Sequence, residues 1–274
     1  MTHLPTASLA SRSNARVFGT GPRTLLLAHG FCSNKQVYAR QVTHFSRSHR
    51  TVTYDLAGFG DADPDLWDPR RYATLEGYAH DIVGLIDELD LRRVTFVGGS
   101  LSAMTGLMAS LARPERFDAL VFVGGSPRYL NARHYRGGFE REAVERFYAL
   151  LDSNEGWTDA VTGLLLNGPL PLALLDIAQA VRGVRPEVAR TVARAVFGSD
   201  YRHLLERALH PVLIVQTASD AAVPEAVGKY MAALLPDAEL TVLPGVGHLP
   251  MRTQPELFNR AVEDFLRHRG GWPG

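Results

Sequence analysis

The chain has 274 residues, of which 46% are hydrophobic and 21% charged, a composition typical of a globular protein. Lysine plus arginine equals aspartate plus glutamate at 29 each, so the charge balance favours neither nucleic acid nor a membrane as a partner. The single cysteine, Cys32, excludes an internal disulfide, and no apolar stretch approaches the roughly 20 residues that span a bilayer. The first 14 residues lack the apolar core of a signal peptide, so we expect a cytoplasmic protein.

Short apolar segments alternate with longer helical patterns along the chain. This alternation predicts βαβ units and a mainly parallel sheet flanked by helices, which is an α/β fold. In chain order, the predicted strands are residues 16–18, 24–28, 51–55, 94–97, 119–123, 212–216 and 240–243. The predicted helices are residues 35–45, 75–90, 102–112, 223–234 and 255–267.

Residues 131–200 interrupt this alternation. They show no strand pattern but several helical segments separated by glycines, with more apolar and aromatic residues than short helices need. We predict that they form a four-helix lid whose apolar underside faces the core, and that residues 1–130 and 201–274 form that core. The simpler alternative is that these apolar residues only hold the lid helices together.

Ser100 lies where a predicted strand turns into a predicted helix. A sharp strand-to-helix turn needs little bulk two residues before and two residues after its apex, and here Gly98 and Ser102 occupy those positions. Such a turn exposes the apex residue beside the free N–H groups of the helix N-terminus. Ser100 is therefore a candidate nucleophile, although the pattern by itself also fits a simple glycine-rich turn.

Asp220 and His248 likewise follow predicted strands. In open α/β sheets, sites form beyond the carboxyl ends of the strands, so we expect both side chains to meet Ser100. A serine hydroxyl becomes a nucleophile when a base takes its proton and an acid holds that base in one tautomer. His248, in a glycine loop after the last predicted strand, is the candidate base, and the alternative is a surface or structural histidine. For Asp220 the alternative is a cap for the helix that begins at Val223.

His29-Gly30-Phe31 follows the second predicted strand. The glycine allows the backbone to approach the site closely, so we expect the N–H groups of Phe31 and Leu101 to form an oxyanion hole. His29 is interpreted as structural because it lies at a strand end beside a tight turn, and Cys32 as a thiol of the pocket wall.

Asp55 begins a glycine-rich segment that we interpret as a loop bracing the site, because a serine mechanism requires no acid there. Gly58 and Gly60 are too weak a pattern to indicate a dinucleotide. No group of His, Cys, Asp and Glu has the spacing of metal ligands, so we predict no metal and no cofactor.

These motifs together resemble the α/β-hydrolase superfamily. The closer likeness is to the RsbQ-like group, which includes a bacterial stress-response regulator and the plant strigolactone and karrikin receptors. The matching segments, between about residues 25 and 266, begin at His29, Arg70, Val97, Gly125, Gly137, Gln216 and Gly247.

The resemblance implies a Ser100–His248–Asp220 triad, a lid of four helices and a small apolar pocket. By position, the pocket is expected to be lined by Phe31, Phe139 and Trp157. The chain departs from the group at Gly99, where a histidine usually precedes the serine. Two consecutive glycines are expected to loosen the backbone of this turn.

The expected function is hydrolysis of a small apolar ester or lactone by a serine mechanism. The alternative is a small-molecule receptor or stress-signalling regulator that hydrolyses slowly and engages a protein partner through its lid. Dehalogenase and epoxide hydrolase chemistry is excluded because those enzymes use aspartate at the position of Ser100. Serine-based cleavage of a carbon–carbon bond remains open.

Overall fold

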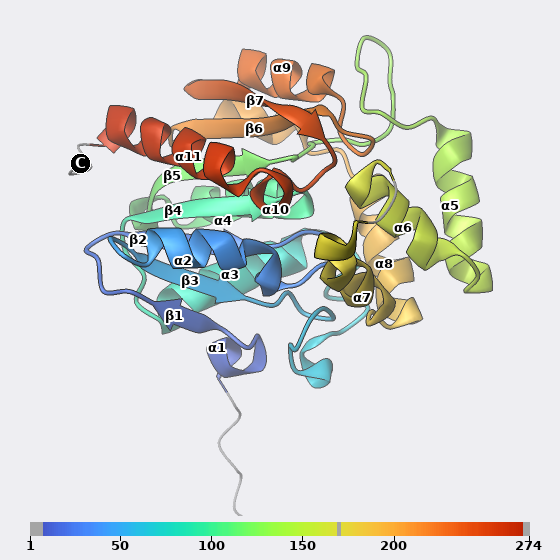
Figure 1. Cartoon of the computed structure of the whole chain (residues 1–274), viewed down its shortest axis with the longest axis horizontal. Coiled ribbons are helices and arrows are strands. Elements are labelled where there is room, and N and C mark those ends of the chain that lie inside the picture. The colour runs from blue at the N-terminus through green and yellow to red at the C-terminus, as the bar shows by residue number, and fades with distance from the viewer. Residues whose placement is uncertain (1–7, 169–170, 271–274) are drawn as a thin grey trace, which may run out of the picture.

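One seven-stranded sheet forms the centre of the molecule (Figure 1). The computed structural model describes residues 8–168 and 171–270. The strand order is β1-β3-β2-β4-β5-β6-β7, in which β1 is antiparallel to β3 and all other neighbours are parallel. The strands are β1 (Arg16–Phe18), β2 (Thr24–Ala28), β3 (Arg50–Tyr54), β4 (Val94–Gly99), β5 (Phe117–Val123), β6 (Val212–Ser219) and β7 (Ala238–Val246). The predicted α/β class is confirmed.

Helices cover both faces of the sheet. Helices α2 (Ala39–Phe45) and α11 (Pro255–Gly270) contact each other on one face, and α3 (Glu76–Glu88) and α4 (Leu101–Ala112) contact each other on the opposite face. Because both faces are covered, β2 and β4 are buried along their whole length, which explains their continuous apolar sequences. The other core helices are α1 (Leu9–Arg12), α9 (Glu225–Leu234) and α10 (Pro250–Thr253).

Four helices lie between β5 and β6 in the chain: α5 (Arg141–Ser153), α6 (Trp157–Leu166), α7 (Leu175–Arg182) and α8 (Pro186–Phe197). They stand together beside the carboxyl ends of the parallel strands (Figure 1). The parts of the expected core and lid ranges at residues 1–7, 169–170 and 271–274 lie outside the described residues.

All seven predicted strands are present, but three of them run further than predicted at their carboxyl ends. Strands β4, β6 and β7 reach Gly99, Ser219 and Val246. The prediction of a glycine loop directly after residue 243 is therefore wrong. Strand β7 passes Pro244 because a shift of register lets Val246 pair with Ser219 of β6.

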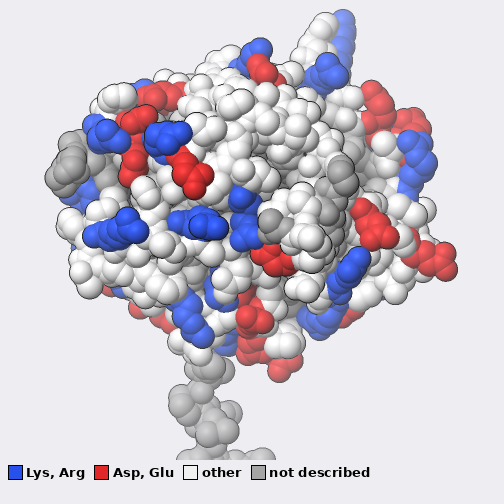
Figure 2. All heavy atoms as spheres, in the orientation of Figure 1, with Lys and Arg blue, Asp and Glu red and all other residues white. Residues whose placement is uncertain are grey.

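Charges of both signs are interspersed on the face shown in Figure 2. This distribution agrees with the equal numbers of basic and acidic residues. Among the helices that the structure describes, none combines the length and the apolar character needed to cross a membrane.

The contact between α4 and β4 yields a test of the packing. Gly106 of α4 lies directly against the ring of Phe96, and an added methyl group would collide with that ring. We expect Gly106→Ala to lower the free energy of unfolding by about 1–3 kcal/mol in urea denaturation. The control is Gly163→Ala in α6, where nothing lies within 4 Å of the added carbon; it should raise stability by roughly 0.5–1 kcal/mol. Equal effects would contradict the packing described.

Candidate active site

Ser100 occupies the apex of a strained strand-to-helix turn. Its φ of 55° and ψ of −117° lie in a region that L-residues rarely adopt, and α4 begins at the next residue. The turn is held by a hydrogen bond from the Ser100 N–H to the carbonyl of Val123, at 2.8 Å. A side chain at Gly98 would collide with the backbone of Ser102, so this glycine permits the chain to fold back.

Asp220 and His248 form a buried pair. His248 Nδ1 donates to Asp220 Oδ2 at 2.7 Å, and both side chains are at most 2% exposed. The other oxygen, Oδ1, accepts from the N–H groups of Ala222 and Val223 at 2.8 and 3.1 Å. Asp220 therefore fixes the turn that follows β6 and also binds the imidazole. It does not cap α9, which begins later, at Glu225.

The hydroxyl of Ser100 hydrogen-bonds to the hydroxyl of Tyr129 at 3.1 Å. Within the described residues this is its one hydrogen-bond partner, and His248 is a neighbour across a shared cavity rather than a partner. Tyr129 is buried, its ring packs edge-on against Phe197, and burial raises the pKa of its hydroxyl. No role was predicted for this tyrosine, although it lies inside one of the matching segments, the one that begins at Gly125.

The cavity beside Ser100 has a volume of about 10 Å³, which is room for roughly one water molecule. The lining residues are Gly30, Phe31, Ser33, Val37, Gly99, Ser100, Val123, Leu165, His248, Leu249 and Met251.

Of the three predicted pocket residues, Phe31 lines this cavity while Phe139 and Trp157 are not among its lining residues. The ring of Phe139 packs edge-on against Phe197 at a centroid distance of 5.3 Å. The indole N–H of Trp157 donates to the side chain of Asn154 at 3.1 Å.

The carboxyl end of α6 contacts His248 and the residue that precedes Asp220. The N–H of His248 donates to the carbonyl of Leu165 at 2.8 Å. The side chain of Asn167 donates to the carbonyl of Ser219, the residue before Asp220, at 3.3 Å. Movement of α6 therefore acts on the imidazole and on the carboxylate loop together.

Phe31 lines the same cavity as Ser100, and Leu101 is the residue that directly follows Ser100, at the start of α4. Within the described part of the chain, neither of their backbone N–H groups makes a backbone hydrogen bond. The two segments touch closely, because a carbon added at Gly30 would lie 2.9 Å from Ser100 Cβ. This pair of free donors next to a serine is the arrangement that an oxyanion hole requires.

Ser102 does more than reduce bulk at the turn. It is fully buried, and its hydroxyl donates to the carbonyl of His29 at 2.5 Å. This bond joins the first turn of α4 to the segment that carries Phe31. Ser102 therefore links the segment that carries Phe31 to the helix that begins at Leu101.

Gly99 belongs to β4 and pairs with Val123, and the expected loosening of the backbone stays a prediction. A side chain at this position would meet the Tyr38 hydroxyl at 3.1 Å and the Met251 methyl group at 3.5 Å. These two residues fill the space beside the turn.

His29 and Cys32 are both fully buried. His29 Nδ1 donates to the carbonyl of Gly30 at 2.9 Å while Nε2 accepts from the N–H of Leu56 at 3.0 Å, which is the pattern of a neutral ring. This supports the structural interpretation of His29. Cys32 is not among the cavity-lining residues, and burial raises the pKa of its thiol, so the predicted place in the pocket wall is not found. Among the described residues, no group of three or more His, Cys, Asp or Glu could hold a metal ion.

The fold and the site together define the class of this protein. Residues 23–255 match the family described as the alpha/beta hydrolase fold. Because this match spans most of the chain, the chain belongs to the α/β-hydrolase family.

The relatives include both enzymes and receptors. Strigolactone esterase D14 of Arabidopsis thaliana is 37% identical over 256 residues, covering 93% of this chain and 94% of the relative. Karrikin insensitive 2 receptor CA of Petunia hybrida is 36% identical over 258 residues, with coverage of 93% and 94%. Among solved structures, a hydrolase from Oleispira antarctica matches with a TM-score of 0.91 and 31% identity, covering 94% of this chain and 96% of that one. The predicted resemblance is confirmed.

The buried His29 yields a prediction for stability against pH. Burial lowers the pKa of His29 below its usual 6.5, so between these two pKa values the unfolded chain binds more protons than the folded chain. The free energy of unfolding should therefore fall as the pH drops below about 6.5, by up to about 1.4 kcal/mol per pH unit from this group.

Urea denaturation between pH 5 and pH 7.5 measures this slope. We expect His29→Gln to reduce it, since glutamine does not titrate, and His80→Gln, on an exposed part of α3, to leave it unchanged. An identical slope in wild type and His29→Gln would show that another group is responsible.

Proposed function

We propose that the protein is a serine hydrolase that cleaves a small apolar ester or lactone. The observation that carries this proposal is the buried His248–Asp220 pair, whose histidine lines one cavity with Ser100 at the apex of a strained turn. The oriented imidazole supplies the base that a serine hydroxyl needs. Esterase and hydrolase activities named for the relatives support the same chemistry.

In the first half-reaction, the Ser100 hydroxyl turns from Tyr129 to His248 Nε2. His248 takes its proton while Oγ attacks the substrate carbonyl, and Asp220 stabilises the resulting imidazolium through Nδ1. The N–H groups of Phe31 and Leu101 bind the negative oxygen of the tetrahedral intermediate. Collapse of this intermediate breaks the bond to the leaving oxygen, which receives the proton from His248 and departs as an alcohol.

In the second half-reaction, water attacks the acyl group held on Ser100. His248 takes a proton from this water and then returns it to Oγ, so that a carboxylic acid is released and the enzyme is restored. With a lactone, the alcohol and the acid remain parts of one product molecule.

We further propose that residues 131–200 form a lid that controls entry. The cavity of about 10 Å³ is too small for an ester, and α6 contributes Leu165 to its wall. Displacement of α6 enlarges the cavity, and Phe139 and Trp157 then join Phe31 as apolar walls. The lid thereby selects small substrates and excludes bulk water during catalysis.

The second candidate is a receptor for a small molecule that is cleaved slowly and that changes how the lid engages a regulatory protein. The name of the Petunia relative favours it. The turnover rate distinguishes the two candidate functions. An enzyme completes many catalytic cycles per minute on a small ester, whereas a receptor completes a single slow cycle with rearrangement of the lid.

Removal of the Ser100 hydroxyl tests the proposed nucleophile. We expect Ser100→Ala to abolish hydrolysis of p-nitrophenyl acetate and labelling by a fluorophosphonate, because no other hydroxyl occupies the apex of the turn. Ser110→Ala is the control; this buried serine of α4 donates to the carbonyl of Leu107, away from the cavity, and its loss should leave labelling intact. Labelling that persists in Ser100→Ala would place the nucleophile elsewhere.

Tyr129 should restrain the nucleophile in the resting protein. Because its hydroxyl competes with His248 for Ser100, we expect Tyr129→Phe to raise the rate of fluorophosphonate labelling by roughly threefold to tenfold, the equivalent of one hydrogen bond. Tyr135→Phe is a matched control, since this buried hydroxyl donates to the carbonyl of Arg128 instead. A slower reaction in Tyr129→Phe would mean that the tyrosine assists the serine.

A further inference from the structure

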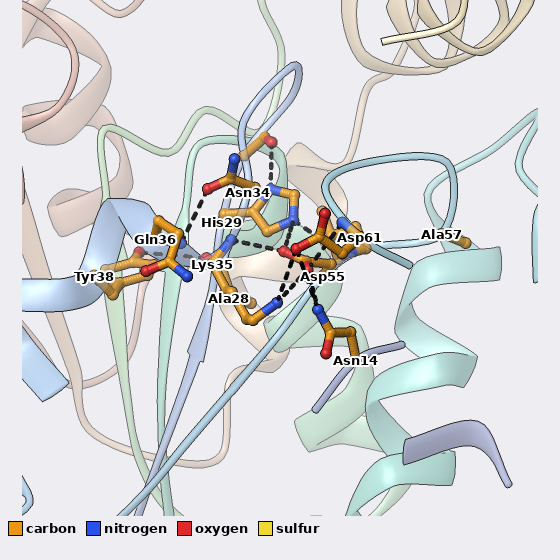
Figure 3. Close-up of polar contacts among 12 residues, drawn as sticks. Asn14, Ala28, His29, Asn34, Lys35, Gln36, Tyr38, Asp55, Ala57 and Asp61 are labelled. Atoms are coloured by element: carbon orange, nitrogen blue, oxygen red, sulfur yellow. Dashed lines mark hydrogen bonds and ion pairs between the residues drawn. The ribbon is translucent and has the colours of Figure 1, made fainter. Parts of the chain in front are cut away.

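Lys35 and Asp55 form a buried ion pair (Figure 3). Lys35, the first residue of the 3₁₀-helix Lys35–Tyr38, places its ammonium 2.5 Å from Asp55 Oδ2, directly after β3. The side chains are 8% and 1% exposed. Burying two charges costs free energy unless further hydrogen bonds satisfy them. The other contacts of this pair therefore indicate which parts of the backbone it fixes in place.

Asp55 binds Lys35 at two points. Its Oδ1 accepts from the backbone N–H of Lys35 at 2.8 Å while Oδ2 binds the ammonium of the same residue. Oδ2 also accepts from the N–H of Asp61 at 3.1 Å and from the side chain of Asn14 at 3.3 Å (Figure 3). The backbone of Lys35 is thereby fixed to the end of β3.

The other end of the same segment is fixed at His29. The ring of His29 binds the carbonyl of Gly30 and the N–H of Leu56, the residue after Asp55, and Ser102 binds the His29 carbonyl. Residues 30–34 therefore span a gap between two anchors, both attached to the end of β3. Phe31 is in this short span, and the backbone of Gly30 lies against Ser100.

We propose that Lys35 and Asp55 are a positioning pair for the oxyanion hole, which rests on the serine hydrolase function proposed above. Neither side chain lines the cavity beside Ser100, so the pair acts through the backbone. By fixing Lys35, it sets the place of the Phe31 N–H relative to the oxygen of the tetrahedral intermediate. Substrate binding in the ground state does not depend on this placement.

The expected signature is a loss of kcat without a matching change in KM. We expect Asp55→Asn to lower kcat on p-nitrophenyl acetate by about 10-fold to 100-fold, because misplacing an oxyanion donor weakens transition-state binding. KM should stay within about twofold, since the donor acts mainly in the transition state. The affinity for butylboronic acid, whose adduct with serine carries an oxygen in the same place, should fall in parallel with kcat.

The variant Asp81→Asn distinguishes a loss of oxyanion-hole positioning from a general loss of folding stability. Asp81 is also a buried carboxylate, hydrogen-bonded to the hydroxyl of Tyr72 at 2.8 Å and paired with Arg71, but it lies on α3 away from the cavity. We expect this variant to lower the melting temperature while leaving kcat and boronate affinity unchanged. Equal kinetic losses in Asp55→Asn and Asp81→Asn would overturn the positioning role.

Two variants of Lys35 keep the test decisive if Asp55→Asn does not fold. Lys35→Arg preserves the charge pair and should retain most of the activity, whereas Lys35→Gln should lose kcat and boronate affinity together. Equal activity of the two variants would overturn the proposal while leaving the hydrolase function intact. A wild-type protein that neither turns over the ester nor labels with fluorophosphonate would overturn both.

Discussion

The site depends on the close approach of three backbone segments around Ser100. The positive φ at this serine is possible because Gly98 leaves room for α4 to fold back, and Gly30 leaves room for the neighbouring segment to lie against the serine. This contact brings the segment that carries Phe31 next to Ser100 and to the first residue of α4, Leu101. The absence of side chains at these two glycines thus permits the close approach of the segments around Ser100.

Hydrogen bonds connect α6, which lines the cavity beside Ser100, to the backbone at His248 and at the residue before Asp220. Helix α6 supplies a wall of the closed cavity through Leu165, and the same residue accepts from the backbone of His248. The adjacent Asn167 binds the carbonyl before Asp220. The proposed opening of the cavity by α6 would therefore act on the backbone that supports the imidazole and on the residue before the carboxylate. Such coupling suits an enzyme with a gated site and also suits a receptor that reports whether its site is filled.

Sequence patterns were sufficient to predict the α/β class, all seven strands and the meeting of Asp220 with His248. These features follow from local signals, because buried parallel strands read as apolar runs and their carboxyl ends meet at one edge. The extension of β7 to Val246 was not predictable, since it depends on pairing with β6 rather than on local preference. The partner of Ser100 was missed for a similar reason: the orientation of a hydroxyl is decided by Tyr129, a residue that the fold brings in from beyond the next strand.

Gly99 shows how one departure from the related sequences is accommodated. The Tyr38 hydroxyl and the Met251 methyl group occupy the volume that a larger residue would take before the serine. Tyr38 is also tied to β2 through the carbonyl of Ala28 at 3.3 Å. The space at position 99 is therefore set by residues 38 and 251: an imidazole at 99 requires a smaller side chain than the phenol at 38.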